Sequence, residues 1–412
     1  MLPLNADVAG GEGLPNLVRG NERFGRRLLE TIHRHDPEHN VVVSPVSLAL
    51  ILGAIQNGSW DQQLCKEIGD AFGWGGHPSL GIPARMLLAA FEEPKRGRSA
   101  PARTTQSPTR PLVVKVLPNQ SFESPEQSWI TNTFLFRSKD PRSGGDIKPI
   151  SPDFVAEASK YFGVTFVNTG AANPTANDVR RARRSAVGLP PVLSTNDVWI
   201  SSGAHLRTAW EGNTFSLSKP FTSDFWTAGG SKIQVQMIAS ELSQYPHAVT
   251  DSFEAVVLPG NSAYMVVVLP APGKDIHELE RNFADSPEIL DTVLKKQNGV
   301  ITMPTFHFDS SRNLEPHLKE MGIEHVFHDL GPIIRIPKSH LTEVSQRIDI
   351  QVDEVGIRAS AETVVGAVYG GITGGVTPFQ MRIDRPFLFL IRDNNTNTLL
   401  FMGAIMDPTQ NR

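Results

Sequence analysis

Hydrophobic residues in the first part of the chain recur with the spacing of helices. Within 21–32, apolar side chains stand at positions 24, 28, 29 and 32, which is the period of an amphipathic helix. Val41–Val43 predicts a short buried strand, and Ser44 followed by Pro45 is a typical helix start. The helix that follows, from 46 to about 56, is apolar nearly all round, so we expect it in the interior of a large protein.

Further along, β-branched and aromatic residues gather in short runs that predict strands. The predicted strands are Trp129–Phe136, Asp197–Ile200, Lys232–Met237, Phe253–Leu258, Tyr264–Leu269, Val300–Phe308, Phe387–Ile391 and Leu399–Ile405. Short helices are expected at 153–162, 276–283, 286–295 and 313–321. Because helices cluster early and strands late, without regular alternation, the sequence predicts an α+β fold with mostly antiparallel sheets.

The composition limits the classes of function that the chain can have. Lys and Arg number 39 against 43 Asp and Glu, a net charge of −4, so binding to nucleic acid is not expected. Cys65 is the only cysteine, which excludes an internal disulfide and a CxxC metal or redox site. No apolar run approaches the ~20 residues of a membrane-spanning helix, so no membrane association is expected. The start, Met1–Asp7, lacks the features of a secretory signal, which leaves the cytoplasm open, or the periplasm or extracellular space if a signal was removed.

The whole chain, 1–412, is expected to form one domain. The composition changes between 75 and 127, and this segment is typical of a surface insertion or mobile loop. Within it, Lys95–Arg110 holds five basic residues and no acidic one. This stretch is a candidate site for a polyanion, although a solvated loop is the stronger interpretation because such a segment has no fixed shape.

Motifs of common enzymes are absent from the sequence. The chain has no G-x-S-x-G, H-E-x-x-H or G-x-x-x-x-G-K-[ST] string. His277 begins a partial zinc-protease motif, but Arg281 stands where the second histidine would be needed. The other grouped histidines, His33, His35 and His39, are expected to be solvated at the end of a helix. We therefore expect no enzyme activity, no cofactor and no metal site.

Four segments resemble the serpin family of serine protease inhibitors. They are Asn40–Ser47, Ile301–Phe306, Met381–Ile391 and Phe401–Gly403. The third fits the family signature at each position, and the fourth follows it at the usual distance. The resemblance implies the serpin fold, with three mainly antiparallel sheets and eight or nine helices. It also implies an exposed reactive-centre loop, here Gly356–Phe379, between a strand of the large sheet A that ends near Asp353 and a strand that starts near Met381.

Inhibitory serpins are suicide substrates. The protease cleaves the loop and forms an acyl-enzyme, and the freed strand then enters sheet A. The protease is dragged across the molecule and its catalytic site is distorted before the ester is hydrolysed. Serpin loop insertion is itself a known example of strand addition to a sheet and of the release of stored strain.

The first half of the loop has a pattern that suits insertion. With period two, one face carries Ile357, Ala359, Ala361 and Thr363, and the other carries Arg358, Ser360 and Glu362. The charged residues fall only on the outward face, so insertion would bury no charge. With Glu354 and Gly356 before it, the inward set forms the expected hinge. Ile357 departs from the Thr, Ser or Val that is usual in inhibitory relatives, and it is expected to pack more slowly.

The family's spacing from Glu354 places the attacked bond at Tyr369–Gly370. A tyrosine on the acyl side suits the apolar pocket of a chymotrypsin-like protease. Because the loop is longer than in common relatives, Val368, Gly370 and Ile372 stay open as alternatives. A cut after Val or Gly would suit an elastase- or subtilisin-like enzyme. The expected partner is a serine protease, or a cysteine protease, in a covalent complex.

Several residues match the positions that control sheet opening in the family. Ser44, Ser47 and Asn196 match positions where relatives hold the two central strands by hydrogen bonds. Gln346 stands where relatives have histidine, and Trp210 resembles the aromatic residue at the point where insertion begins. Because glutamine does not titrate, sheet opening is expected to be insensitive to pH between roughly 5 and 8.

Two functions stay open at this stage. The first is suicide inhibition by a free monomer. The second is a non-inhibitory serpin that acts as a carrier, chaperone or storage protein. Large or charged residues on the inward face of the loop would favour the second function, and Ile357 is the only large residue on that face.

Overall fold

The fold was analysed in a computed structural model. It describes residues 13–75, 80–92, 127–136, 150–168, 197–212, 214–215, 219–285, 289–330, 340–358 and 377–410. Among these residues, no helix is long and apolar enough to cross a membrane.

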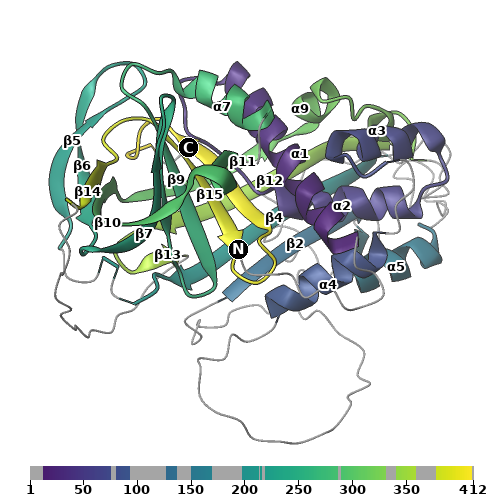
Figure 1. The fold of residues 1–412 in the computed structure, drawn as a ribbon. Coiled ribbons are helices and arrows are strands. Elements are labelled where there is room, and N and C mark those ends of the chain that lie inside the picture. Colours follow the sequence, from purple (N-terminus) through teal and green to yellow (C-terminus); the bar gives the residue numbers. More distant parts are fainter. Residues whose placement is uncertain are drawn as a thin grey trace, which may run out of the picture.

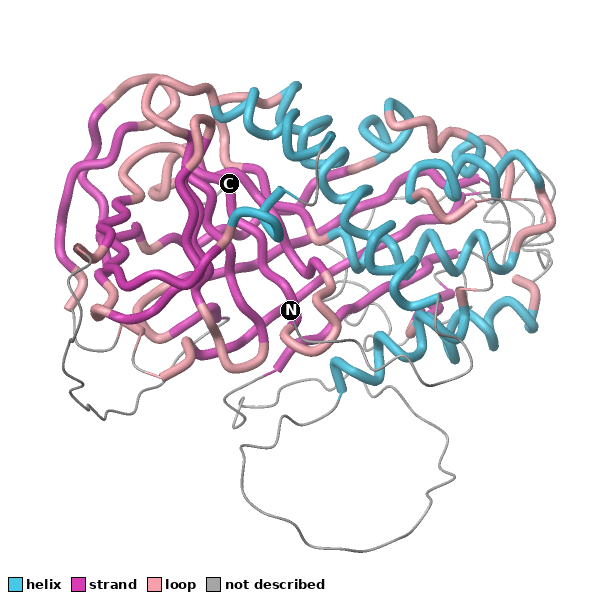
Figure 2. Tube along the Cα trace, in the orientation of Figure 1, coloured by secondary structure: helices cyan, strands magenta, loops and turns pink. Residues whose placement is uncertain are grey.

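Most helices of the described residues lie together on one side of the molecule, and most strands lie on the other (Figures 1 and 2). In chain order, the helices are α1 (Gly13–His35), α2 (Pro45–Gly58), α3 (Gln62–Phe72), α4 (Gly81–Glu92), α5 (Pro152–Phe162), α7 (Ile276–Asp285), α8 (Ile289–Val293) and α9 (Glu315–Glu320), with the 3-10 turn η1 (His325–Phe327). Helix α2 is buried over almost its whole length, as its apolar sequence predicts. Helix α3 was not expected from the sequence. It begins at Asp61, whose carboxylate accepts a hydrogen bond from Leu64 N at 3.0 Å, and it ends at Gly73 in the left-handed conformation.

A six-stranded sheet runs along the helices. Its order is β11 (Phe306–Asn313), β12 (His340–Val352), β13 (Gly356–Arg358), β4 (Asp197–Ala209), β2 (Gln127–Phe136) and β3 (Val164–Asn168). Strands β12 and β4 also pair directly with one another, in parallel, from His340↔Asp197 to Ile348↔Ala204. The short strand β13 therefore separates β12 from β4 at only one end.

The remaining described strands form one continuous sheet of ten strands. They are β1 (Val41–Val43), β16 (Leu399–Ile405), β15 (Phe387–Asp393), β9 (Ala263–Pro270), β8 (Phe253–Leu258), β7 (Ser243–Val249), β10 (Lys295–Pro304), β6 (Lys232–Ala239) and β5 (Phe221–Trp226), with β14 (Phe379–Arg382) paired to β10. The expected serpin fold is confirmed, with the two smaller of its three sheets joined through one strand. Strand β10 pairs with β7 along its first half and with β6 along its second half, so it joins the two smaller sheets into one.

Part of the segment expected to be an insertion or loop is helical. Within 75–127, Gly81–Glu92 forms α4, whose Ala84 and Leu87 are buried in the core. The apolar residues of this stretch have helical spacing, and the basic composition further on obscured that pattern. Lys95–Arg110 lies outside the described residues.

A buried carboxylate fixes α1 to the core. Glu22 accepts hydrogen bonds from Arg26 Nε at 3.1 Å, one helical turn on, and from Arg392 Nη1 at 3.0 Å, at the end of β15. Arg26 also donates to the carbonyl of Phe283 in α7 at 2.9 Å. Burial opposes ionisation of Glu22, but the two guanidinium groups outweigh it and hold the pKa of Glu22 below its usual value.

We expect Glu22→Gln to lower the free energy of unfolding by about 3–5 kcal/mol at neutral pH, because it removes the carboxylate that two buried guanidinium groups share. Since the pKa of Glu22 is lowered in the folded state, its stabilisation is complete above the unfolded-state pKa and is lost as the pH falls through the folded one. The difference between variant and native protein should therefore shrink in acid. Urea unfolding at several pH values measures it, with the exposed Glu38→Gln as control. An equal loss at all pH values would contradict this account.

Candidate functional site

The site begins where the chain leaves β12 and turns back into the same sheet. Strand β13 pairs antiparallel with both neighbours: Ile357 lies opposite Val352 of β12 and Thr208 of β4, and Gly356 lies opposite Ala209. The first residues of the expected loop thus occupy a strand position between β12 and β4. At the other end of the segment, Phe379 belongs to β14, so both ends of the expected loop are strands.

A tight turn directs the chain into this position. Asp353 Oδ1 accepts hydrogen bonds from Val355 N at 2.9 Å and from Gly356 N at 3.2 Å, and Asp353 N donates to Gly356 O at 3.0 Å. Trp210 closes the turn from β4: its Nε1 donates to Asp353 O at 2.8 Å, and its backbone N donates to Val355 O at 3.2 Å. The indole is buried in the core. The structure thus places Trp210 at the entry of β13, next to the expected hinge residue Glu354.

Close packing explains the residues at the start of β13. A Cβ atom at Gly356 would lie 2.2 Å from the carbonyl oxygen of Thr208, so only glycine fits against β4 there. The side chain of Ile357 is 0% exposed and belongs to the hydrophobic core. Burying such a side chain contributes about 1.5–3 kcal/mol relative to exposure, so Ile357 stabilises β13 in its present place.

A buried polar cluster links α2 to the strand β12. Gln346 Nε2 donates to Ser44 O at 2.8 Å and to Ser47 Oγ at 2.9 Å, and its Oε1 accepts from Ser44 N at 3.1 Å. Ser44 Oγ donates to Leu400 O in β16 at 2.8 Å. The structure therefore brings Ser44, Ser47 and Gln346 together, all of them buried. One amide side chain makes three hydrogen bonds to the first turn of a helix.

The same level of the sheet holds two residues that the sequence analysis missed. Gln346 lies opposite Ser202 of β4, and Ser202 lies opposite Asn132 of β2. Asn132 Nδ2 donates to Ser47 O at 2.8 Å, so β2 is also bonded to α2. The row of Asn132, Ser202 and Gln346 crosses the three strands at the level where β12 and β4 pair directly. Counting residues back along β4 from Trp210 would have pointed to Ser202 as a member of this row.

Several expected site residues lie outside the described part of the chain. They are Asn196, Ala359, Ala361, Thr363, Val368, Tyr369, Gly370 and Ile372. The assignments of the attacked bond and of the inward-facing loop residues therefore stay predictions from the sequence.

The family assignment follows from comparison with known proteins. The family described as Serpin (serine protease inhibitor) matches residues 146–408, which is more than half of the chain. This chain belongs to the serpin family, and the six-stranded sheet corresponds to sheet A.

Similar proteins cover the chain over nearly its full length. It is 25% identical to Iripin-3 of the tick Ixodes ricinus over 412 residues, which is 97% of this chain and 96% of that protein. Human thyroxine-binding globulin with its hormone bound matches the fold with a TM-score of 0.76 and 20% identity, covering 97% of this chain and 100% of the other. Native protease nexin-1 with heparin matches with a TM-score of 0.72 and 19% identity, covering 96% and 100%. At these identities the two structures establish the fold.

We expect sheet opening to become pH-dependent in the variant Gln346→His. Protonation of a histidine removes the acceptor that Ser44 N uses, so opening should accelerate as the pH falls through about 6.5. The native protein should show no such step between roughly pH 5 and 8, because glutamine does not titrate. Tryptophan emission after cutting the loop would follow the rate, since Trp210 lies at the entry. A parallel pH dependence in both proteins would show that Gln346 does not set the rate.

Proposed function

We propose that this serpin inhibits serine proteases by suicide-substrate trapping. The observation that carries the proposal is the position of β13: the start of the loop lies between β12 and β4, in register with both. A cut further along the loop would free the chain behind β13 to continue in the same direction. Strands β12 and β4 would then separate pair by pair, starting at Ile348↔Ala204.

The hydrogen-bond balance favours that movement. Insertion replaces one parallel ladder between β12 and β4 by two antiparallel ladders, one on each side of the new strand. About ten additional ladder bonds, each worth a net ~0.5–1.5 kcal/mol, would supply on the order of 10 kcal/mol. The inward residues after Ile357 are Ala359, Ala361 and Thr363, which are small enough to enter a packed sheet.

The polar row of Asn132, Ser202 and Gln346 opposes the opening of the sheet before cleavage. Gln346 bonds β12 to Ser44 and Ser47, and Asn132 bonds β2, the neighbour of β4, to Ser47 O. If β4 and β2 move away from β12 together, either the bonds of Gln346 or the bond of Asn132 must break. A buried polar group that loses its partner costs about 1–3 kcal/mol. The row therefore holds the sheet closed until the new strand replaces the lost ladder.

The partner proposed for the loop is a serine protease with an apolar pocket, attacking Tyr369–Gly370. Elastase- and subtilisin-like enzymes, cutting after Val368 or Gly370, are the alternatives. The basic stretch Lys95–Arg110 is proposed as a weaker, polyanion-binding element, by analogy with protease nexin-1, whose structure holds heparin. The protein is proposed to act as a monomer.

One observation favours the non-inhibitory alternative. The hinge is already inserted and Ile357 is fully buried, so part of the energy of insertion is released before any protease arrives. A loop held in this way would insert more slowly into the sheet after cleavage. Thyroxine-binding globulin, a carrier by its name, shares the fold, and a carrier or storage role is therefore the second candidate.

The proposal is tested by incubation with chymotrypsin, pancreatic elastase and subtilisin, followed by a denaturing gel and mass spectrometry. We expect a covalent band near the summed masses, with cleavage between Tyr369 and Gly370. Clean cleavage within 364–376 without a complex would contradict inhibition and support the second candidate.

Two matched variants test the direction of insertion. Ala361→Arg places a charge on the inward face and should abolish the complex while cleavage continues, because a buried unpaired charge is prohibitive. Ser360→Arg places the same charge on the outward face and should leave the complex intact. Ile357→Thr should raise the ratio of complex to cleaved product. Equal loss of complex in both arginine variants would contradict the period-two pattern.

A further inference from the structure

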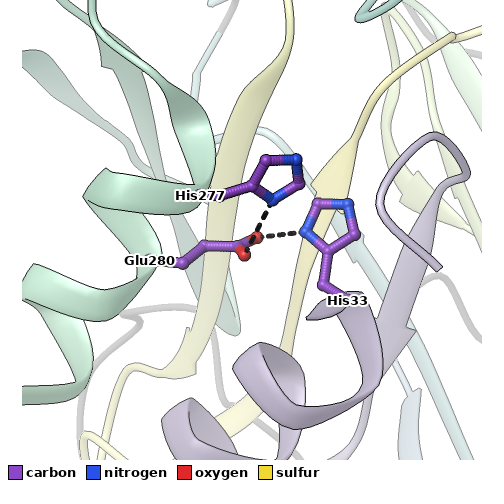
Figure 3. A group of neighbouring side chains, drawn as sticks. All are labelled: His33, His277 and Glu280. Carbon is purple, nitrogen blue, oxygen red and sulfur yellow. Dashed lines mark hydrogen bonds and ion pairs between the residues drawn. The ribbon is translucent and has the colours of Figure 1, made fainter. Parts of the chain in front are cut away.

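Two helices bring a group of metal-ligating side chains together, far from the loop in the sequence. His33 stands in the last turn of α1, and His277 and Glu280 stand one turn apart at the start of α7 (Figure 3). The sequence analysis expected His33 to be solvated and expected no metal site. The first expectation was wrong, because the side chain of His33 is 0% exposed, whereas His35 and His39 are exposed.

The three side chains converge on one point. Glu280 Oε1 lies 2.7 Å from His33 Nδ1, and Glu280 Oε2 lies 3.7 Å from His277 Nδ1. The two imidazole rings are tilted against one another at a centroid distance of 4.5 Å. One ligand atom from each residue lies within 4.8 Å of the others. Small rotations would bring all three to the ~2.0–2.2 Å at which zinc holds histidine nitrogen and carboxylate oxygen.

Burial makes this group costly without a cation. The side chain of Glu280 is only 3% exposed, and a buried carboxylate needs a compensating charge. Among the described residues, none hydrogen-bonds His33 Nε2. His277 is 27% exposed, which gives an ion from solution a way in.

The surrounding charges permit a divalent cation. Near His277, Asp275 favours a cation and Arg281 opposes it. On α1, Arg26 is bonded to Glu22 and to the carbonyl of Phe283. His33 lies at the C-terminal end of α1, where the helix dipole favours positive charge.

We propose that His33, His277 and Glu280 bind a divalent cation of the zinc class between α1 and α7. Two imidazole nitrogens and one carboxylate are a ligand set that zinc prefers over magnesium or calcium. His33 and His277 bind through Nδ1 as neutral imidazoles, each with its one remaining proton on Nε2. A water molecule completes the tetrahedron on the exposed side of His277.

The ion would cross-link α1 and α7. Binding to the folded protein alone stabilises it by mass action. Because an imidazole must be neutral to bind a metal ion, protons compete with the metal, and affinity should fall as the pH is lowered. The site is independent of the reactive loop, and the proposal stands whether or not the protein inhibits proteases.

The test is titration calorimetry of the chelator-treated full chain with zinc chloride at neutral pH. We expect one zinc ion per chain and a raised Tm. His277→Gln should weaken binding at least ~10-fold, since even outer-shell changes cost ~10–100-fold. His39→Gln is the matched control, an exposed histidine that should leave zinc affinity unchanged.

A second readout separates this site from surface histidines. Cobalt(II) should give the intense visible bands of a tetrahedral site in the native protein and in His39→Gln, and lose them in His277→Gln. No binding, binding unchanged in His277→Gln, or binding lost in His317→Gln at the His35–His317 surface pair would overturn the proposal.

Discussion

The parallel ladder between β12 and β4 is the interaction on which the rest of the structure depends. It runs from His340↔Asp197 to Ile348↔Ala204, with one irregularity between Leu341 and Glu343, and beyond that point β13 lies between the two strands. Parallel pairing is slightly weaker per residue than antiparallel pairing. The sheet therefore contains a boundary between a closed part and an opened part, and the proposed mechanism requires the free energy of the molecule to fall if that boundary advances.

Local contacts hold this boundary in place. The turn at Asp353, the indole of Trp210 and the buried side chain of Ile357 fix the start of β13. Below it, Gln346 bonds β12 to the first turn of α2. In the proposed mechanism the first group keeps the hinge in the sheet and the second opposes opening of the remaining ladder. Their balance would then decide whether the chain inhibits or acts as a carrier.

The sequence predicted the class of fold because its core elements are strongly patterned. Val41–Val43 and the apolar helix after Ser44 lie where their sequence places them. The continuity of the ten-stranded sheet was not predictable, because it depends on which partners β10 pairs with. Only one of the three residues of the polar row was named from the sequence: Gln346 came from the family pattern, while Asn132 and Ser202 depend on strand register. The grouping of His33 with His277 needs the packing of two helices that are distant in the chain.

The most direct test of the central claim is the stability of the protein after its loop has been cut. Limited proteolysis within 364–376, followed by denaturant unfolding, compares the cut and uncut forms without any need for a covalent complex. If the freed strand advances between β12 and β4, the free energy of unfolding should rise on the order of 10 kcal/mol, from about ten new ladder bonds. An unchanged unfolding midpoint would mean that the sheet stays closed behind Ile357, and it would contradict the account.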